Sequence, residues 1–218
     1  MTAFDLLTIG HSNSPAPRFI AMLRAAGADA IADVRSLPVS RFCPWFSAKT
    51  LAPLLAGEHM DYLFFGEELG GRPRDPALYC EGAADYKIAD YDAMARQGSF
   101  QAGLERLLHD AARHRLCLMC SEREPLDCHR CLLVARALAA RGASIGHILY
   151  DGSIEPHTTT EQRLLQLADA DNDLFASGQQ ERLAAAYRRR SRAVAYRVKK
   201  AATAATVRKE TVRQKKSR

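Results

Sequence analysis

Short apolar runs alternate with amphipathic segments over the first 65 residues of the chain. Unbroken apolar runs of this kind are typical of strands buried on both faces, and apolar side chains that recur every three or four positions are typical of helices. The runs predict strands at Leu6–Gly10, Ala30–Val34 and Tyr62–Phe65, and the periodic segments predict helices over 19–27 and after Ser47. Strands and helices in this order predict parallel βαβ units.

The pattern is lost between Gly66 and Tyr91, where Gly, Pro, Arg and acidic residues dominate. Long connections in compact domains are usually functional or mobile, so we expect an excursion from the sheet with a short helix near Tyr86–Arg96. Periodicity then returns. It predicts strands at Leu116–Cys120 and Ile145–Tyr150 and helices over 100–114, 128–141 and 160–168.

These elements predict one α/β domain, built on a mostly parallel sheet of about five strands with helices on both faces. An α+β arrangement with an antiparallel edge strand at Ile145–Tyr150 is the alternative. After Asp169 the chain becomes polar and then basic, and it carries no apolar pattern that would fold alone. We therefore expect the domain to cover residues 1–170, followed by a basic C-terminal extension over residues 171–218 that is either helical or disordered.

The charge of the chain is divided unequally along its length. All 218 residues together have a formal net charge of +6, but the segment 187–218 contains many Lys and Arg residues and a single acid, Glu210. The rest of the chain is therefore net acidic. A basic, Ala-rich segment favours non-specific contact with a polyanion, so we expect DNA or RNA as a partner of residues 187–218. A solvated extension without a partner is the alternative.

Composition restricts the class of protein. Hydrophobic residues make up 47% of the sequence, which is enough for a core and excludes a wholly disordered chain. No apolar run approaches the ~18 residues that a membrane span requires, and the N-terminus lacks the pattern of a signal peptide. The six cysteines are clustered, so we interpret them as thiols in a reducing compartment. These features predict a cytoplasmic protein with no membrane partner.

Polar side chains follow three of the predicted strands at the point where each strand ends. Loops at the carboxyl ends of parallel strands share one edge of the sheet, where ligands bind. We therefore expect the three groups to form one site, although ordinary turn chemistry would account for any one of them. The groups are His11, Ser12 and Asn13; Asp33, Arg35, Ser36, Ser40 and Arg41; and Ser121, Glu122, Cys128, His129 and Arg130.

An ordered set of motifs spans the same region. Taken together, over about residues 5–157, it resembles the bacterial and archaeal DUF488 family, which is defined by sequence and has no established general function. The resemblance implies an α/β fold and no particular reaction. Cys131 stands where such proteins usually have an apolar residue, and the basic extension lies outside the resemblance. The motifs are Thr8–Asn13, Asp33–Arg41, Leu69–Pro73, Cys120–Glu122, Cys128–Arg130, His147–Leu149 and Asp151–Gly152.

Two thiols in this set are candidate nucleophiles. Cys120 ends a predicted strand, and Cys128 begins a predicted helix whose first turn holds His129 and Arg130. A helix N-terminus and a nearby cation lower the pKa of a thiol and favour the thiolate that attacks a substrate. Either cysteine therefore fits a catalytic role beside Glu122. The alternative is that Cys120 only packs beneath the loop.

Four cysteines also have a spacing that is compatible with zinc. Cys117 and Cys120 form one CxxC pair, and Cys128 and Cys131 form a second. However, Cys117 and Cys120 should point to opposite faces of a strand, and Cys131 shares a helical stripe with apolar residues. We therefore predict no bound metal, keep a structural zinc site as a lesser alternative, and find no sign of a particular cofactor.

Arginine and histidine side chains in and near these groups predict an anionic ligand. Arg35, Arg41, Arg72 and Arg130 supply guanidinium groups, which bind phosphate well. His11 and His129 are candidates for acid–base catalysis, because imidazole titrates near neutrality. The expected function is an enzyme that acts on a phosphate-bearing small molecule or nucleotide, and the alternative is a non-catalytic module that binds a nucleotide or nucleic acid. The remaining residues assigned to substrate binding are Ser12, Asn13, Asp33, Ser36 and Ser40.

Overall fold

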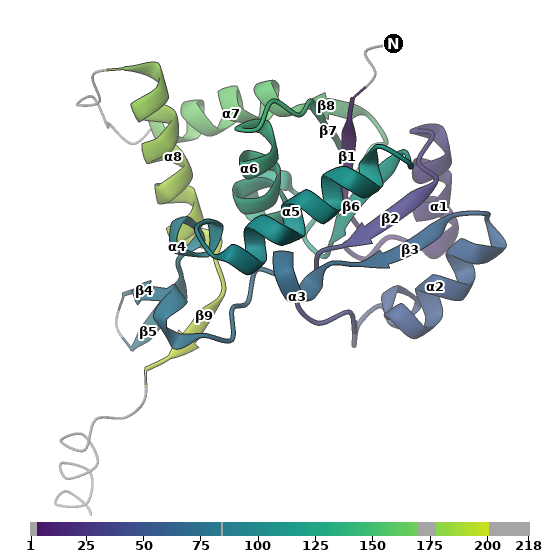
Figure 1. The fold of residues 1–218 in the computed structure, drawn as a ribbon, viewed down its shortest axis with the longest axis horizontal. Coiled ribbons are helices and arrows are strands. Elements are labelled where there is room, and N and C mark those ends of the chain that lie inside the picture. Colours follow the sequence, from purple (N-terminus) through teal and green to yellow (C-terminus); the bar gives the residue numbers. More distant parts are fainter. Residues whose placement is uncertain (1–3, 84, 170–177, 201–218) are drawn as a thin grey trace, which may run out of the picture.

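The computed structural model describes residues 4–83, 85–169 and 178–200 and has an α/β fold built on a six-stranded sheet (Figure 1). The α/β class predicted from the sequence is therefore confirmed. The strands of the main sheet are β1 (Leu6–Gly10), β2 (Ala30–Asp33), β3 (Asp61–Phe64), β6 (Leu116–Cys120), β7 (Ile145–Ile148) and β8 (Ile154–Pro156). The helices are α1 (Ala16–Ala25), α2 (Ala48–Gly57), α3 (Gly66–Leu69), α4 (Tyr91–Ala95), α5 (Gly98–Ala111), η4 (Arg130–Ala135), α6 (Arg136–Ala139), α7 (His157–Asp169) and α8 (Gln179–Val194).

The main sheet is parallel except at one edge. Its order is β3-β2-β6-β1-β7-β8, and the pairs from β3 to β7 are all parallel, whereas β7 and β8 are antiparallel. The central strands β1 and β6 are buried at every position, which explains their unbroken apolar sequences. In this register Gly10 lies opposite Cys120 and Asp33 lies opposite Met119. The carboxyl ends of β1, β2 and β6 therefore meet at one edge.

Helices cover both faces of the sheet, as the sequence pattern predicts. On one face, α1 and α2 pack on the core cluster that contains Leu7, Ile9 and Cys117. On the other face, α5, η4, α7 and α8 pack on the cluster that contains Leu6 and Cys120. Because successive side chains of a strand alternate between faces, the two cysteines of β6 belong to different cores.

Two expectations about the sheet are corrected. The main sheet has six strands rather than about five, because Ile154–Pro156 adds a short strand that an apolar run does not reveal. The segment Ile145–Tyr150, expected as an antiparallel edge in the α+β alternative, instead forms β7, which is parallel to β1 and ends at Ile148. The antiparallel edge is β8. A chain reversal between Leu149 and Ser153 returns the strand beside β7.

The excursion after Gly66 is more ordered than its composition predicts. It forms a second sheet of β4 (Tyr79–Glu81), β5 (Tyr86–Ala89) and β9 (Arg197–Lys199), all antiparallel. The helix expected near Tyr86–Arg96 is limited to α4, because its first residues belong to β5. This small sheet joins the excursion to a segment more than a hundred residues later in the chain.

The helix expected over 128–141 has an irregular first part. Arg130–Ala135 form a π-helical turn, η4, and only the next four residues are α-helical as α6. The π-helix contains one more residue per turn than the α-helix, and such turns are frequent at functional sites. All six residues of η4 are buried.

The first part of the expected C-terminal extension packs on the domain. Tyr187 and Ala186 of α8 are buried in the same core as β6. Three basic side chains from this part contact residues of the domain: Arg190 pairs with Asp127, and Arg192 and Lys200 contact Glu81. The expected contact of residues 187–218 with DNA or RNA stays a prediction, and residues 201–218 lie outside the described residues. Across the described residues, no helix combines the length and apolar character needed to cross a membrane.

Candidate functional site

The three polar groups predicted from the sequence lie side by side at the carboxyl ends of β1, β2 and β6. Backbone hydrogen bonds join the three segments: the N–H of His11 donates to the carbonyl of Cys120 at 2.9 Å, and the N–H of Val34 donates to that of Met119 at 3.1 Å. Gly10 permits this closeness, because a Cβ atom at that position would lie 1.8 Å from the backbone oxygen of Glu122. The site is therefore built on rigid strand ends.

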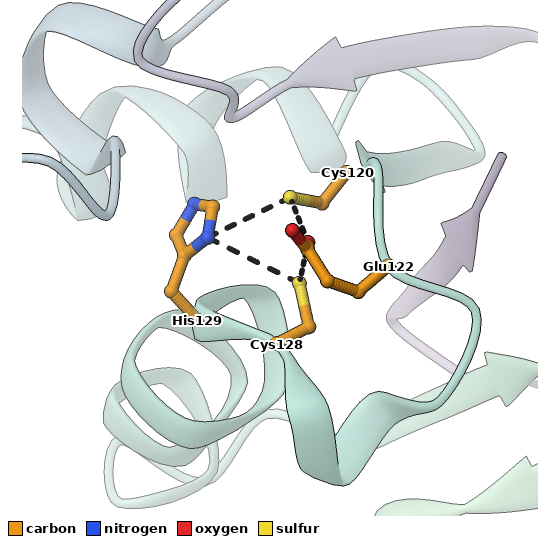
Figure 2. A group of neighbouring side chains, drawn as sticks. All are labelled: Cys120, Glu122, Cys128 and His129. Carbon is orange, nitrogen blue, oxygen red and sulfur yellow. Dashed lines mark hydrogen bonds between the residues drawn. The ribbon is translucent and has the colours of Figure 1, made fainter. Parts of the chain in front are cut away.

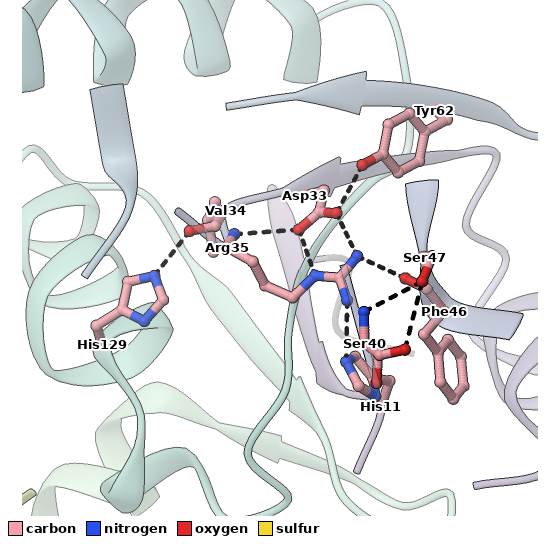
Figure 3. Close-up of polar contacts among 9 residues, drawn as sticks. All are labelled: His11, Asp33, Val34, Arg35, Ser40, Phe46, Ser47, Tyr62 and His129. Carbon is pink, nitrogen blue, oxygen red and sulfur yellow. Dashed lines mark hydrogen bonds and ion pairs between the residues drawn. The ribbon is translucent and has the colours of Figure 1, made fainter. Parts of the chain in front are cut away.

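Asp33 and Arg35 form a buried ion pair at the end of β2 (Figure 3). The Nε of Arg35 donates to Asp33 Oδ1 at 2.9 Å, and its Nη2 donates to Asp33 Oδ2 at 2.6 Å. A further bond from Nη2 reaches the carbonyl of Phe46, and the hydroxyl of Tyr62 donates to Asp33 Oδ2. The side chains of Arg35 and Asp33 are only 5% and 0% exposed. Arg35 is thus held by the protein itself rather than offered to an anion.

His11 lies beside this pair with both ring nitrogens engaged. Its Nδ1 is 2.8 Å from the carbonyl of Ser12, so Nδ1 carries the proton, and its Nε2 accepts from Arg35 Nη1 at 3.2 Å. The ring of His11 stacks on Phe46 at a centroid distance of 4.2 Å. Burial lowers the pKa of His11 to about 4, and the positive charge of Arg35 acts in the same direction. His11 is therefore a neutral brace in this arrangement.

Cys120, Glu122, Cys128 and His129 form a second group, here called the cysteine cluster (Figure 2). Glu122 Oε2 lies 3.0 Å from the Sγ atoms of both Cys120 and Cys128. His129 Nδ1 faces the same two sulfur atoms at 3.6 and 4.0 Å. Both cysteines and His129 are buried. Glu122 is an exposed loop residue, but its carboxylate turns inward toward the sulfurs. The cluster therefore has one side that faces solvent.

The charges of the cysteine cluster favour a thiolate. Burial opposes ionisation of Cys128, but the bond to Cys120 and the positive charges of Arg130 and His129 outweigh it and hold the pKa of Cys128 well below its usual range. Burial and the charge on Cys128 raise the pKa of the Cys120 thiol and of the Glu122 carboxyl. The pKa of His129 is raised despite its burial, because Cys128 and Glu122 stabilise the cation. A Cys128–His129 ion pair follows, with Cys120 and Glu122 able to share protons.

Backbone groups fix the positions of His129 and Cys128. His129 Nε2 lies 2.9 Å from the carbonyl oxygen of Val34, which links the cysteine cluster to the end of β2 (Figure 3). A carbonyl only accepts, so Nε2 carries a proton and Nδ1 is the atom aimed at the sulfurs. The N–H of Arg130 donates to Cys128 Sγ at 3.4 Å.

Arg130 is fully buried and braces the loop that carries Glu122. Its Nη1 donates to the carbonyl of Glu122 at 2.6 Å, and its Nη2 donates to that of Arg123 at 3.0 Å. The role in anion binding expected from the sequence for Arg35 and Arg130 therefore does not match their contacts. The first pairs with a carboxylate and the second with backbone carbonyls.

The other predicted site residues lie at the periphery. Ser12 and Asn13 are outside the buried clusters, and Arg123 Nη2 donates to Asn13 Oδ1. Ser40 accepts from the N–H of Cys43, and Arg41 is exposed. These contacts belong to loop structure.

Ser36 and Arg72 line a cavity of about 400 Å³, whose wall does not include the four residues of the cysteine cluster. The hydroxyl of Ser36 accepts from the N–H of Arg72 at 2.9 Å. Gly71, between the cavity residues Gly70 and Arg72, packs on His129 so closely that a Cβ atom would lie 2.6 Å from the ring. Gly71 therefore stands between the wall of the cavity and the ring of His129.

The four-cysteine zinc alternative does not fit the structure. Cys117 lies in the core on the opposite face of β6 from Cys120. Burial raises the pKa values of Cys117 and Cys131 far above the usual range of a thiol. Both are core residues, as their positions in the sequence predict.

A buried polar chain lies beyond the predicted site. Thr8 Oγ1 is 2.7 Å from His147 Nδ1, His147 Nε2 is 2.9 Å from His157 Nδ1, and His157 Nε2 is 3.1 Å from the hydroxyl of Tyr187. Tyr187 donates to Glu161 at 3.0 Å, so the Tyr187 oxygen accepts from His157, and both imidazoles carry their proton on Nε2. The sequence motifs include His147 but give no partner for it. Sequence reasoning misses this chain, and also the contact of Tyr62 with Asp33, because the partners are distant in sequence.

Comparison with known proteins identifies the family. The model of a domain of unknown function, DUF488, matches residues 15–137, which is more than half of the chain. No curated protein and no solved structure matches. The matched region contains Asp33, Arg35 and the whole cysteine cluster. The chain therefore belongs to the DUF488 family.

Proposed function

We propose that the protein is a thiol-dependent enzyme that acts on a small molecule with an anionic group, with Cys128 as the nucleophile. The observation that supports this most directly is the convergence of two thiols, an imidazole and a carboxylate at the carboxyl edge of the sheet, where Gly71 separates His129 from the wall of a cavity. Ligands of open parallel sheets bind at this edge. A nucleophile with a base or ion-pair partner within reach is the common arrangement of thiol enzymes.

Each member of the cysteine cluster has a defined role in this proposal. His129 stabilises the Cys128 thiolate and supplies a proton to a leaving group, because its Nδ1 faces both sulfurs. The N–H of Arg130 stabilises charge on Cys128. Glu122 is the exposed member, so a substrate reaches the sulfur by displacing its carboxylate.

The cavity supports a polar substrate and assigns its anionic group to a different arginine. Arg72 and Arg74 line the cavity together with Ser36 and the acidic residues Glu67, Glu68 and Asp75. The guanidinium of Arg72 stacks on the ring of Tyr196 and makes no ion pair with a described residue there, whereas Arg35 and Arg130 donate their hydrogen bonds to protein oxygens. Guanidinium groups at a cavity surface bind carboxylate or phosphate. Arg72 is therefore the residue we assign to the anionic group, and His11 is assigned a structural role.

Alkylation of individual cysteines tests the nucleophile. In metal-free protein at pH 7, iodoacetamide should modify Cys128 at least about tenfold faster than the buried thiols Cys117 and Cys131, because only a thiolate reacts readily. Replacing His129 with Gln should lower the alkylation rate of Cys128 by about tenfold or more, because the thiolate loses the cation that stabilises it. Peptide mass spectrometry follows each cysteine separately.

Cys80 is the internal reference for these rates. It is half-buried and lies on β4, outside the cysteine cluster, so His129→Gln should leave its alkylation rate unchanged. If Cys128 reacts no faster than Cys117, the nucleophile is misassigned and the non-catalytic binding module becomes the better description.

A thermal-shift screen tests the ligand class. Inorganic phosphate, nucleoside monophosphates and phosphorylated sugars should include a compound that raises the melting temperature of the wild type but not of Arg72→Ala. At a hundredfold excess over its dissociation constant, a ligand stabilises by about 2.7 kcal/mol. Arg41→Ala is the matched control, since Arg41 is an exposed arginine that does not line the cavity. Equal stabilisation of wild type and Arg72→Ala would place the anion elsewhere.

A further inference from the structure

We infer that the cysteine cluster is a zinc-binding site with Cys120, Glu122, Cys128 and His129 as ligands. One donor atom from each residue lies within 4.8 Å of all the others. The four donors are two sulfurs, one nitrogen and one carboxylate oxygen, supplied by the end of β6, the loop after it and the start of the following helix (Figure 2). Sulfur and imidazole donors in one closed group select zinc among the common divalent ions.

The distances between donors match a tetrahedral site. Zinc–sulfur and zinc–nitrogen bonds of about 2.3 and 2.1 Å imply sulfur–nitrogen separations of about 3.6 Å. The separations from His129 Nδ1 to the two sulfurs are 3.6 and 4.0 Å. Glu122 Oε2 is closer to the sulfurs, at 3.0 Å, so metal binding requires its carboxylate to retreat by about half an ångström. The exposed position of Glu122 permits that movement.

The surroundings orient the ligands as they do in established zinc sites. Histidine ligands usually donate their second ring N–H to a carbonyl or carboxylate, which fixes the ring and the coordinating nitrogen. His129 makes this contact to Val34 through Nε2 and leaves Nδ1 for the metal. The bond from the N–H of Arg130 to Cys128 Sγ stabilises a thiolate in the same way.

The charge balance of the bound state is favourable. Two thiolates and a carboxylate bring three negative charges against two on the metal, and the buried guanidinium of Arg130 lies next to the cluster. Binding displaces the proton of the Cys120 thiol and the proton on His129 Nδ1, and these protons pass to solvent.

This inference concerns the same residues as the proposed function, and it rests on that function in one respect: bound zinc would block the proposed nucleophile. A zinc ion bound to Cys128 occupies the sulfur lone pair that attacks a substrate, so zinc is a reversible inhibitor of the thiol enzyme. Alkylation of Cys128 should accordingly be suppressed by one equivalent of Zn²⁺ and restored by a chelator.

Metal titration of the full-length chain tests the site. Reduced protein stripped with a chelator should bind one Zn²⁺ per chain in competition with a chromophoric chelator. Co²⁺ in its place should give the strong visible bands of tetrahedral cobalt and a near-ultraviolet charge-transfer band from thiolate. The double variant Cys120→Ser, Cys128→Ser should lose stoichiometric Zn²⁺ binding and the thiolate charge-transfer band of Co²⁺. Glu122→Ala, at an exposed position, should weaken zinc binding by more than about tenfold, since even changes outside the ligand set cost 10–100-fold.

Two matched variants separate the alternatives. Cys117→Ser, on the same strand but the opposite face, should bind zinc like the wild type. Cys131→Ser should also do so, although Cys131, His147 and His157 form another group of possible donors. Binding that survives in the double variant but is lost in Cys131→Ser would overturn the inference, as would the absence of stoichiometric binding in the wild type. Fast alkylation of Cys128 without zinc binding would leave the proposed function standing, and zinc binding without fast alkylation would leave only the metal site.

Discussion

Replacing Asp33 with Ala is expected to lower the free energy of unfolding by about 3–5 kcal/mol, because it leaves the buried guanidinium of Arg35 without its counterion. Arg35 makes two bonds to this carboxylate, and both side chains are almost fully buried. The hydroxyl of Tyr62 loses its acceptor in the same variant. Chemical denaturation followed by circular dichroism measures the change.

Two further variants locate the cause of that loss. Asp29→Ala removes an exposed carboxylate just before β2 and should change the free energy of unfolding by less than about 1 kcal/mol. Asp33→Ala combined with Arg35→Met removes both charges and should recover a large part of the loss, because no unpaired charge remains buried. If Asp33→Ala costs no more than Asp29→Ala, the pair does not hold the end of β2.

Acidification is expected to destabilise the protein through His157. Burial lowers the pKa of His157 to about 4, compared with 6.5 for an unperturbed imidazole. Between about pH 6.5 and pH 4, His157 is therefore protonated in the unfolded chain but neutral in the folded chain. The free energy of unfolding falls as the pH drops through this range, by about 3 kcal/mol in total for this group. The hydrogen-bond geometry explains why the folded chain does not protonate His157. Protonation of His157 Nδ1 would place an N–H against the N–H of His147, 2.9 Å away.

Denaturation at pH 7 and pH 4.5 should therefore show a smaller loss of stability in His157→Gln than in the wild type. His109→Gln, at an exposed position of α5, should behave like the wild type. The comparison between variants is needed because His129 and Glu122, whose pKa values are raised, change stability in the opposite direction. Identical pH dependence in His157→Gln and the wild type would show that the polar chain accepts a proton without cost.

The central sheet was predictable because its strands are buried on both faces. Leu6–Gly10 and Leu116–Cys120 are unbroken apolar runs for that reason. β8 was not predictable, since Ile154–Pro156 is a three-residue edge strand that contains a proline, and prolines are confined to such edges. β5 and β9 pair across more than a hundred residues, a relation that no local pattern contains.

The same distinction applies to the site. Parallel strands bring their carboxyl ends together, so the meeting of His11, Asp33 and Cys120 at one edge follows from the order of the elements. The hydrogen-bond partner of each arginine does not follow from the order of the elements. Whether a guanidinium faces a ligand, a carboxylate or a carbonyl depends on side-chain directions that the sequence does not encode locally, which is why Arg130 looked like an anion-binding residue and is a brace.

The wide turn η4 acts as an insertion of a single residue in a helix. If a relative lacked one residue between Arg130 and Ala135, its helix would be regular, and every side chain before the deletion would rotate by about 100° relative to α6. The apolar packing of Leu138 would survive, but Cys128 and His129 would no longer face Cys120. The number of residues in this turn therefore indicates whether Cys128 and His129 can face Cys120 in a given family member. Family members that keep the six-residue turn should keep the proposed thiol chemistry, and members with a shortened turn should lack it while retaining the fold.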